Sequence, residues 1–270
     1  MTDREAGVHR VLVLGAGFAG LAVACEAAGR GLEVTATSRS LERANALREA
    51  HPALAVEHLA RLDANVARLV GTGTHVIVTF PPDGATDARV APHLAHARAL
   101  TYLSTVGVYD DHTGHLDDTT PLPATPSPRA TARLAAEQRW REAGATVLRC
   151  PAIYGADRGV HVRLAQRTFR VPGDGSRATS RLHVEDLAAL TLAAAAFRAD
   201  TFVVGDEHPT THDEVVRWVC AQRGLPHPGY VPLEEVHPTL RADRRVDASR
   251  ALRELRVTLR FPSYREGMRA

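Results

Sequence analysis

Three glycines near the start of the chain have the spacing of a turn that holds phosphates. They form the pattern G-x-G-x-x-G after the apolar run 11–14, which predicts a buried parallel strand, and before an alanine-rich helix. In such a turn the first glycine permits a tight bend and the second lets a pyrophosphate approach the backbone. The third lets the helix pack on the strand, and the helix start offers free N–H groups. The predicted contacts of a dinucleotide are Gly15, Gly17, Phe18, Ala19 and Gly20.

The segment after the next predicted strand reads Thr37-Ser38-Arg39-Ser40 and carries no carboxylate. A protein that holds NAD usually places Asp or Glu here for the ribose hydroxyls. Arg39 could instead pair with a 2′-phosphate and stack on the adenine, and Ser38 and Ser40 could add hydrogen bonds. We therefore expect NADP in preference to NAD. The alternative is that Arg39 is a solvated residue at the entry to a helix.

Predicted strands and helices alternate along the first part of the chain. Apolar runs at 11–14, 32–40, 53–59, 74–82, 99–105 and 145–155 predict strands, with helical segments between them. Such strands indicate a parallel sheet covered on both faces, so we predict an α/β protein with a doubly wound Rossmann fold. Residues 1–150 would form the nucleotide-binding core. Residues 151–270 would form a smaller substrate-binding lobe, interleaved with the core in a single structural unit.

Two loops are candidates for a functional role because of their length or glycine content. Residues 110–128 are rich in Pro, Asp and Thr and lie between a predicted strand and a helix. A loop of this length in a compact domain is usually functional. The stretch 172–181 contains Gly173 and Gly175, which would let it move as a lid over a substrate.

The composition excludes several classes of protein. The formal net charge of +2 is too small to predict a nucleic-acid partner. The apolar runs are too short for a membrane span, and the first residues lack an apolar signal segment, so we expect a cytoplasmic protein. The three cysteines and 14 histidines do not have the spacing of metal ligands, so no metal is predicted.

Five motifs together resemble one family, the extended short-chain dehydrogenases/reductases, or NAD-dependent epimerase/dehydratase-like proteins. "VLVLGAGFAG", "YLSTVGVYDD", "PRATARLAAE", "LRCPAIYG" and "SRLHVEDLA" follow one another at the spacing of that family over nearly the whole chain. The glycine pattern and the tail "LRFPSYREG" are closer to its atypical members. The resemblance implies an NAD(P) cofactor and a small-molecule substrate with a carbonyl or hydroxyl group. Relatives often pair through helices that flank the site, so we expect a monomer or a homodimer.

In that family a Ser or Thr after the fifth strand and a Tyr-x-x-x-Lys on the next helix carry the reaction. The resemblance places Thr105 at the Ser/Thr position, with Ser104 beside it. Arg129 falls on the Tyr position and Arg133 on the Lys position, where it would contact the nicotinamide ribose. Tyr109 borders the same cleft and is a further candidate for proton transfer.

The resemblance also implies contacts with the cofactor and the substrate at the ends of other strands. Pro81 ends the fourth predicted strand, and Pro151 and Ile153 would pack against the nicotinamide. A small, possibly anionic substrate would contact Arg129, Tyr154 and Arg181.

The two departures from the family pattern differ in weight. All 33 basic residues of this chain are arginine, so Arg133 in place of Lys keeps the charge and reflects a coding bias. Arg129 in place of Tyr is different, because a guanidinium stays protonated and cannot exchange a proton as a phenol does. Three hypotheses stay open: an NADP-dependent enzyme that uses Arg129 as a clamp, a non-catalytic NADP(H)-binding regulator or scaffold, and a non-redox isomerase or dehydratase.

Overall fold

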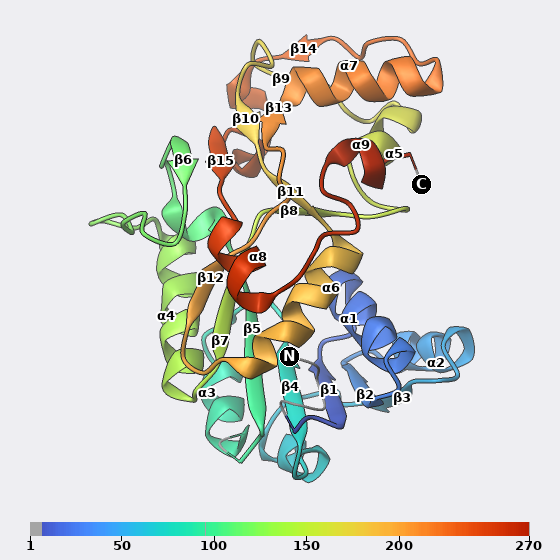
Figure 1. Ribbon diagram of the computed structural model, residues 1–270, viewed down its shortest axis with the longest axis vertical. Helices are drawn as coiled ribbons and strands as arrows, with labels where there is room; N and C mark the ends of the chain where they lie inside the picture. The colour runs from blue at the N-terminus through green and yellow to red at the C-terminus, as the bar shows by residue number, and fades with distance from the viewer. Residues whose placement is uncertain (1–6, 95, 270) are drawn as a thin grey trace.

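The structure is a computed structural model that describes residues 7–94 and 96–269. Within these residues, seven strands form one sheet in which all neighbours run parallel (Figure 1). Their order, β12-β7-β5-β4-β1-β2-β3, is doubly wound, which confirms the predicted fold class. The strands are β1 (Arg10–Leu14), β2 (Glu33–Ser38), β3 (Ala55–His58), β4 (Thr74–Val78), β5 (Ala99–Thr105), β7 (Thr146–Cys150) and β12 (Thr201–Val203).

One face of the sheet is covered by α1 (Phe18–Gly29), α2 (Leu41–Ala50) and α6 (Val184–Ala193). The helices α1 and α6 lie against each other over the middle of the sheet (Figure 1). Val23 of α1 and Ala188 of α6 are buried in the same apolar cluster, and many of its residues are small. Alanine and glycine let these helices approach the sheet closely, which is why an alanine-rich sequence can form this layer.

The other face is covered by α3 (Thr86–Val90) and α4 (Pro128–Glu142). Trp140 of α4 is fully buried and stacks on Tyr102 of β5, with ring centroids 6.1 Å apart. Its indole N–H donates to the buried carboxylate of Asp87 at 2.8 Å. This contact satisfies the polar tip of the largest side chain in the core and fixes the end of α4.

The winding of the chain reverses between β1 and β4. From β1 the chain moves to β2 and β3 on one side, and from β4 it moves to β5, β7 and β12 on the other. In doubly wound folds ligands bind outside the carboxyl ends of the strands at this point. The glycine turn follows β1 directly, so the reversal lies at the predicted dinucleotide site.

From Pro151 onward the chain alternates between the core and a group of short elements beyond one end of the sheet. Its helices α6 and α8 (Ser249–Leu255) and strand β12 pack with the core, and most of the other elements lie toward the top and right of Figure 1. No helix in the described ranges has the length and apolarity needed to cross a bilayer. The short strands are β8 (Ala152–Tyr154), β9 (Val171–Pro172), β10 (Ala178–Thr179), β11 (Arg181–His183), β13 (Thr210–Thr211), β14 (Tyr230–Val231) and β15 (Arg244–Val246). The helices are α5 (Val160–Ala165), α7 (His212–Arg223), α8 (Ser249–Leu255) and α9 (Tyr264–Gly267), and 3₁₀ turns occur at 64–69, 91–94, 106–109, 194–196, 233–235 and 238–240.

Two predicted elements differ from the structure. The predicted strand 145–155 is divided at Pro151, which lacks the N–H needed to continue a ladder. Its second half, β8, pairs with β11 instead of the main sheet. The predicted loop 110–128 contains a short strand, β6 (Gly114–Leu116), which pairs in parallel with β15. Neither pairing has a local signal, because each partner lies far away in the sequence.

Candidate active site

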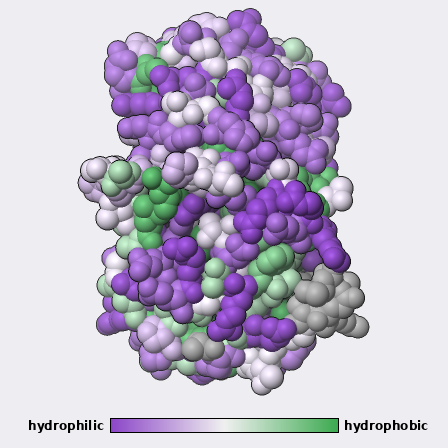
Figure 2. All heavy atoms as spheres, turned by 60° about the vertical axis from the view of Figure 1, so that its left-hand side comes forward, coloured by the Kyte–Doolittle hydropathy of each residue, from purple (hydrophilic) through white to green (hydrophobic). Residues whose placement is uncertain are grey.

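A cleft of about 1510 Å³ opens at the carboxyl ends of the central strands. It is lined by the glycine turn, the ends of β5 and β7, the first turns of α4, and residues 178–180 and 237–246. Figure 2 shows a mostly hydrophilic surface on one side of the molecule, with smaller hydrophobic areas near its waist. The volume exceeds the roughly 300–1,000 Å³ of ordinary ligand pockets, so the cleft has room for a dinucleotide and a second molecule.

The glycine turn is held by threonines from two neighbouring strands. Gly15 has a φ of +105°, and its N–H donates to the hydroxyl of Thr37 at 3.1 Å. The hydroxyl of Thr79, just after β4, donates to the carbonyl oxygen of Gly15 at 2.5 Å. A Cβ on Gly20 would lie 2.1 Å from that same carbonyl oxygen. Only glycine therefore lets α1 pack on the turn at this distance, as the pattern predicts.

Gly17 has a different environment, because a Cβ at this position would meet no protein atom within 4 Å. It is the N-cap of α1, which has no side-chain cap and no acidic residue in its first turn. By contrast, Ser40 caps α2 and Ser127 caps α4. The first N–H groups of α1 have no acceptor within the helix, and Gly17, Phe18, Ala19 and Gly20 line the cleft. Open space beside uncapped amides is the arrangement that accepts a phosphate.

In the segment after β2, two serines make hydrogen bonds within the protein and one arginine is exposed to solvent. The hydroxyl of Ser38 donates to the carbonyl oxygen of Ser40 at 3.0 Å. The hydroxyl of Ser40 accepts a hydrogen bond from the N–H of Arg43 at 3.2 Å. Arg39 is exposed, and its guanidinium makes no hydrogen bond or ion pair with the other described residues. Its guanidinium is therefore available to a ligand, while the two serines have structural roles of their own.

At the end of β5 the two hydroxyl residues face different partners. Thr105 lines the cleft, and its oxygen accepts a hydrogen bond from the N–H of Gly107 at 3.0 Å. Its hydroxyl proton can still be donated to a ligand. Ser104 instead donates its proton to the buried carboxylate of Glu137 at 2.5 Å. Of the two predicted residues, Thr105 has the better placement to polarise a substrate oxygen.

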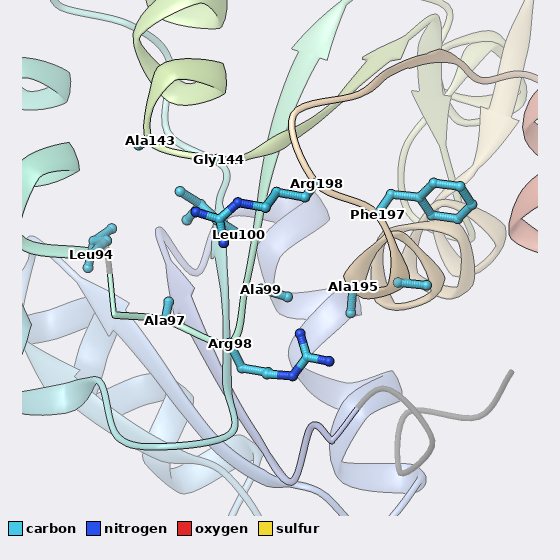
Figure 3. Close-up of a pocket in the computed structure, with 11 residues that line it drawn as sticks. Leu94, Ala97, Arg98, Ala99, Leu100, Ala143, Gly144, Ala195, Phe197 and Arg198 are labelled. Atoms are coloured by element: carbon cyan, nitrogen blue, oxygen red, sulfur yellow. The ribbon is translucent and has the colours of Figure 1, made fainter.

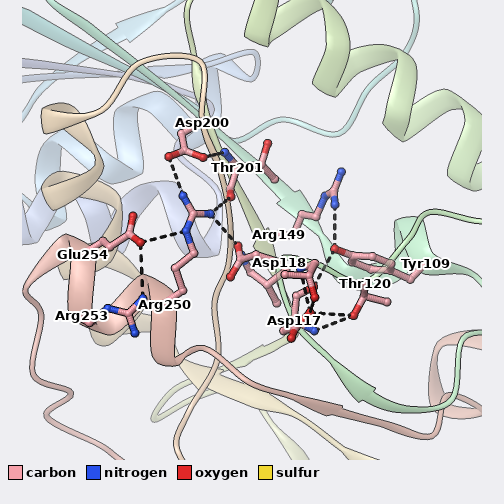
Figure 4. Close-up of polar contacts among 12 residues, drawn as sticks. Tyr109, Asp117, Asp118, Thr120, Arg149, Asp200, Thr201, Arg250, Arg253 and Glu254 are labelled. Atoms are coloured by element: carbon pink, nitrogen blue, oxygen red, sulfur yellow. Dashed lines mark hydrogen bonds and ion pairs between the residues drawn. The ribbon is translucent and has the colours of Figure 1, made fainter.

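Glu137 is the centre of a buried polar network between α4 and the sheet. Arg149 of β7 reaches the Glu137 carboxylate from Nη2 at 2.7 Å and from Nε at 3.2 Å. The exposed fractions of the two side chains are 1% for Glu137 and 9% for Arg149. A third donor of the guanidinium, Nη1, lies 2.8 Å from the phenol oxygen of Tyr109 (Figure 4). The pair is bidentate and desolvated, so it anchors α4 to the sheet.

The predicted Tyr109 borders the cleft, but its phenol is held by protein partners. Its side chain is buried, and its hydroxyl donates to the carbonyl oxygen of Asp117 at 3.4 Å. Burial raises the pKa of Tyr109, and the nearby Arg149 cation offsets this only in part. Both features favour a structural role for this phenol over proton transfer.

The first turn of α4 is fixed by an unusual residue, Asp110. Its φ is +46°, and its carboxylate accepts hydrogen bonds from the N–H and the hydroxyl of Ser127, both at 2.6 Å. Ser127 in turn caps the helix through the N–H of Ala130 at 3.2 Å. Arg129 is exposed and Arg133 is half-buried, and both line the cleft. The structure therefore brings both predicted arginines together with Thr105.

The floor of the cleft is apolar where β7 ends. Pro151 and Ile153 line it, and Pro81 lines it from the end of β4. Cys150, at the same place, is fully buried, and burial raises its pKa to about 12, with the Arg133 charge acting in the opposite direction. Burial therefore favours the neutral thiol, which is a poor nucleophile.

Two predicted substrate contacts are corrected by the structure, since neither residue lines the cleft. Tyr154 is buried, and its hydroxyl donates to the carbonyl oxygen of Ser263 at 3.3 Å. Arg181 is buried too, with its guanidinium 5.8 Å from the ring centroid of Tyr264 and its charge close to that of Asp206. Both side chains belong to the interior of the carboxyl-terminal elements.

A smaller pocket lies at the opposite, amino-terminal end of β5 (Figure 3). Its volume is about 90 Å³, and Arg98 and Arg198 extend along its apolar walls. This space is far below that of ordinary ligand sites, so the cleft at the glycine turn is the candidate active site.

No family model and no curated protein matches this sequence, but solved structures match it over nearly its whole length. A functionally unknown conserved protein from Silicibacter pomeroyi has a TM-score of 0.81 and 28% identity, and the match covers 97% of each chain. MoeE5, in complex with UDP-glucose and NAD, has a TM-score of 0.76 and 21% identity over 96% of each chain. UDP-glucuronic acid 4-epimerase from Bacillus cereus, in complex with NAD, has a TM-score of 0.76 and 16% identity over 96% of each chain.

The chain has the fold of the NAD-dependent epimerase/dehydratase family. This confirms the resemblance that the five motifs indicate. Both MoeE5 and the epimerase are described in complex with NAD. A likeness of fold does not carry over a substrate, so the chemistry of this chain depends on its own side chains.

Asp110 and Arg244 shape this cleft and are absent from the predicted set. Asp110 positions α4, and the double Asp after "GVY" is a weak signal for it. Arg244 of β15 donates to the carbonyl oxygens of Val106 at 3.0 Å and His112 at 3.2 Å, and so ties the carboxyl-terminal part to the cleft wall. No sequence signal marks Arg244, because its partners lie about 130 residues earlier.

The loop 110–128 has a further anchor at Asp118 and lines the cleft beyond it. Arg250 of α8 contacts Asp118 at 3.4 Å and Asp200 at 2.9 Å (Figure 4). Asp118 also accepts a hydrogen bond from the N–H of Val203 at 2.8 Å. Beyond this anchor, Leu122 lines the cleft with 41% of its surface exposed. The loop therefore forms one wall of the cleft, and the contacts of Asp118 hold it in place.

Replacing Glu137 by Gln should destabilise the protein by about 3 kcal/mol or more, because it leaves the Arg149 charge buried without a counterion. Urea unfolding measures the difference. The control is Glu57→Gln, which breaks the exposed ion pair with Arg68 at 3.0 Å and should cost less than about 1 kcal/mol. Equal losses in the two variants would contradict the anchoring role of the buried pair.

Replacing Gly17 by Val should fill the space beside the uncapped amides of α1. We expect the affinity for NADPH and NADH, measured by calorimetry, to fall at least about 10-fold, which corresponds to about 1.4 kcal/mol. The melting temperature should stay within a few degrees, because no protein atom lies within 4 Å of the new Cβ. Gly29→Val at the other end of α1, where a Cβ also meets nothing within 4 Å, is the control and should bind like the unmodified protein.

Proposed function

We propose that this protein is an NAD(P)-dependent enzyme of the oxidoreductase or epimerase/dehydratase type that acts on a small anionic carbonyl or hydroxyl compound. The observation that carries the proposal is the continuity of one cleft. It runs from the open glycine turn at Gly17 to the hydroxyl of Thr105 and the guanidinium groups of Arg129 and Arg133. A dinucleotide on the turn would place its reactive end near these three side chains.

The residues of the turn fit the cofactor. The uncapped amides of α1 and the open space at Gly17 suit a diphosphate, and the apolar floor with Pro151 and Ile153 suits a nicotinamide ring. When bound, the dinucleotide supplies or accepts a hydride. We favour NADP, because Arg39 is exposed beside the end of β2 and has no partner among the described residues. A guanidinium there can pair with a 2′-phosphate through two parallel hydrogen bonds.

The substrate side of the cleft is rich in positive charge. Arg129 and Arg133 line it from α4, while Asp110 already accepts two hydrogen bonds from Ser127. Arginines presented in this way bind a carboxylate or phosphate and attract anions from solution. The charge balance therefore favours a substrate with at least one anionic group.

In the proposed reaction Thr105 hydrogen-bonds the substrate oxygen, and the guanidinium groups stabilise the negative charge that develops on it. Neither arginine can accept a proton, so the proton of the substrate oxygen is exchanged with water. The phenol of Tyr109 takes no part, because it lies in the interior with Arg149. Arg129 thus binds the substrate and polarises its oxygen, whereas the family's tyrosine would act as acid or base.

The second candidate function is a non-catalytic NADP(H)-binding regulator. Arg129 at the position of the family's tyrosine favours this function, because the residue that normally exchanges the proton is missing there. Turnover decides between the two functions. An enzyme either oxidises NADPH with, or epimerises or dehydrates, some member of a panel of 2-oxo acids, sugar phosphates and nucleotide sugars, whereas a regulator binds NADPH tightly and converts none of them.

Replacing Arg129 by Ala should raise KM for the best anionic substrate by about 10- to 100-fold, because one charge-assisted hydrogen bond of about 1.5–3 kcal/mol is lost. The Kd for NADPH should change less than twofold. Arg141→Ala, at the exposed far end of the same helix, is the control and should have no effect. If Arg129→Tyr restores turnover to a protein that otherwise lacks it, Arg129 marks a decayed site instead of a clamp.

Replacing Arg39 by Ala should weaken NADPH binding by about 10-fold or more and leave NADH binding unchanged, because only NADPH has a 2′-phosphate. Calorimetry with both nucleotides measures this. Arg43→Ala, on the exposed side of α2, is the matched control. Equal loss for the two nucleotides, or none for either, would show that Arg39 does not select NADP.

A further inference from the structure

Arg158 lies in a tight turn directly after β8. The N–H of Gly155 donates to the carbonyl oxygen of Arg158 at 2.8 Å, and the N–H of Arg158 donates back to Gly155 at 3.1 Å. These two hydrogen bonds fix the backbone that carries the arginine. Its side chain is exposed and lines the cleft beside Gly17 and Phe18, although the turn belongs to the carboxyl-terminal part of the chain.

The turn is docked against the start of α1. Gly155 is buried, and a Cβ there would lie 3.2 Å from the ring of Phe18 and 2.9 Å from the side chain of Val184. The missing side chain at Gly155 therefore allows the turn to approach the glycine turn closely. As a result, the Arg158 guanidinium lies 4.9 Å from the centroid of the Phe18 ring.

The space between Arg158 and the start of α1 is bordered by positive charge on both sides. Arg158 has no ion pair with a described carboxylate, and α1 has no acidic residue in its first turn. The start of a helix carries a partial positive charge, so a free guanidinium beside it is repelled unless an anion lies between them. The contact with Phe18 gives the cation a neutral partner in the protein alone. Two positive groups from distant parts of the sequence thus border one open space.

We propose that Arg158 binds the diphosphate of the dinucleotide, opposite the amides of α1. This inference rests on the proposed function, because it needs a dinucleotide on the glycine turn. The guanidinium leaves the face of Phe18 and pairs with phosphate oxygens, which the planar fork of arginine suits. Since Arg158 follows β8, the carboxyl-terminal part of the chain contacts the cofactor directly, and cofactor binding holds the two sides of the cleft together.

The test uses Arg158→Ala and Arg158→Lys in the full-length protein, with NADPH, NADH and ADP-ribose as probes in calorimetry. ADP-ribose keeps the diphosphate and lacks the nicotinamide. Arg158→Ala should weaken all three by a similar factor of about 10 to 100, and Lys should recover part of the loss. The slope of log Kd against log salt concentration should also become smaller.

Arg163→Ala is the matched control, because Arg163 lies over Phe169 at the same 4.9 Å but does not line the cleft. It should leave all three Kd values unchanged. Unchanged affinities in Arg158→Ala would overturn the proposal while the Gly17→Val result still supports the nucleotide site. A loss confined to substrate KM would overturn it too, since the arginine would then belong to the substrate. If the unmodified protein binds no dinucleotide, the proposed function itself fails, and this inference with it.

Discussion

The buried ion pair between Glu137 and Arg149 sets the position of the helix on which the candidate chemistry depends. Removing two such charges from water costs several kcal/mol for each, so the pair holds only where every remaining donor and acceptor is satisfied. Ser104 and Tyr109 complete that set. The helix α4 can neither rotate nor slide without leaving a charge unpaired in the core. Arg129 lies about two helical turns before Glu137, so its place over the cleft follows from this constraint.

The cleft combines fixed positive charge with neutral groups where a base would be expected. Tyr109 is held in the interior, and burial keeps the Cys150 thiol neutral. A hydroxyl group beside two guanidinium ions has a lowered pKa, because a nearby cation favours its ionised form. Fixed cations can therefore do by electrostatics part of what a phenolate does by accepting a proton. In the proposed reaction water is the proton acceptor, so turnover does not require the family's tyrosine.

The parts of the structure that sequence patterns could predict are those decided by local contacts. Gly20 meets the carbonyl oxygen of Gly15 five residues earlier, and Ser40 caps the helix that follows it. The roles of Arg181 and Tyr154 were beyond such patterns, because the partners that bury them come from segments far along the chain. The pairing of β6 with β15 has the same cause. A parallel pairing between distant short strands leaves no periodicity in either of them.

The absence of lysine separates the two substitutions in the family's catalytic pair. A chain that uses arginine for every basic residue would place arginine at the lysine position whether or not the site is active, so Arg133 says little about activity. Its charge still acts at the end of the cleft, because it opposes the rise that burial causes in the pKa of Cys150, a residue that lines the cleft. No such bias explains arginine in place of tyrosine, because this chain keeps five tyrosines. Arg129 is therefore the residue at which the sequence departs most from the family pattern, and its placement over an open cleft beside the glycine turn supports the proposal of a changed reaction over a lost one.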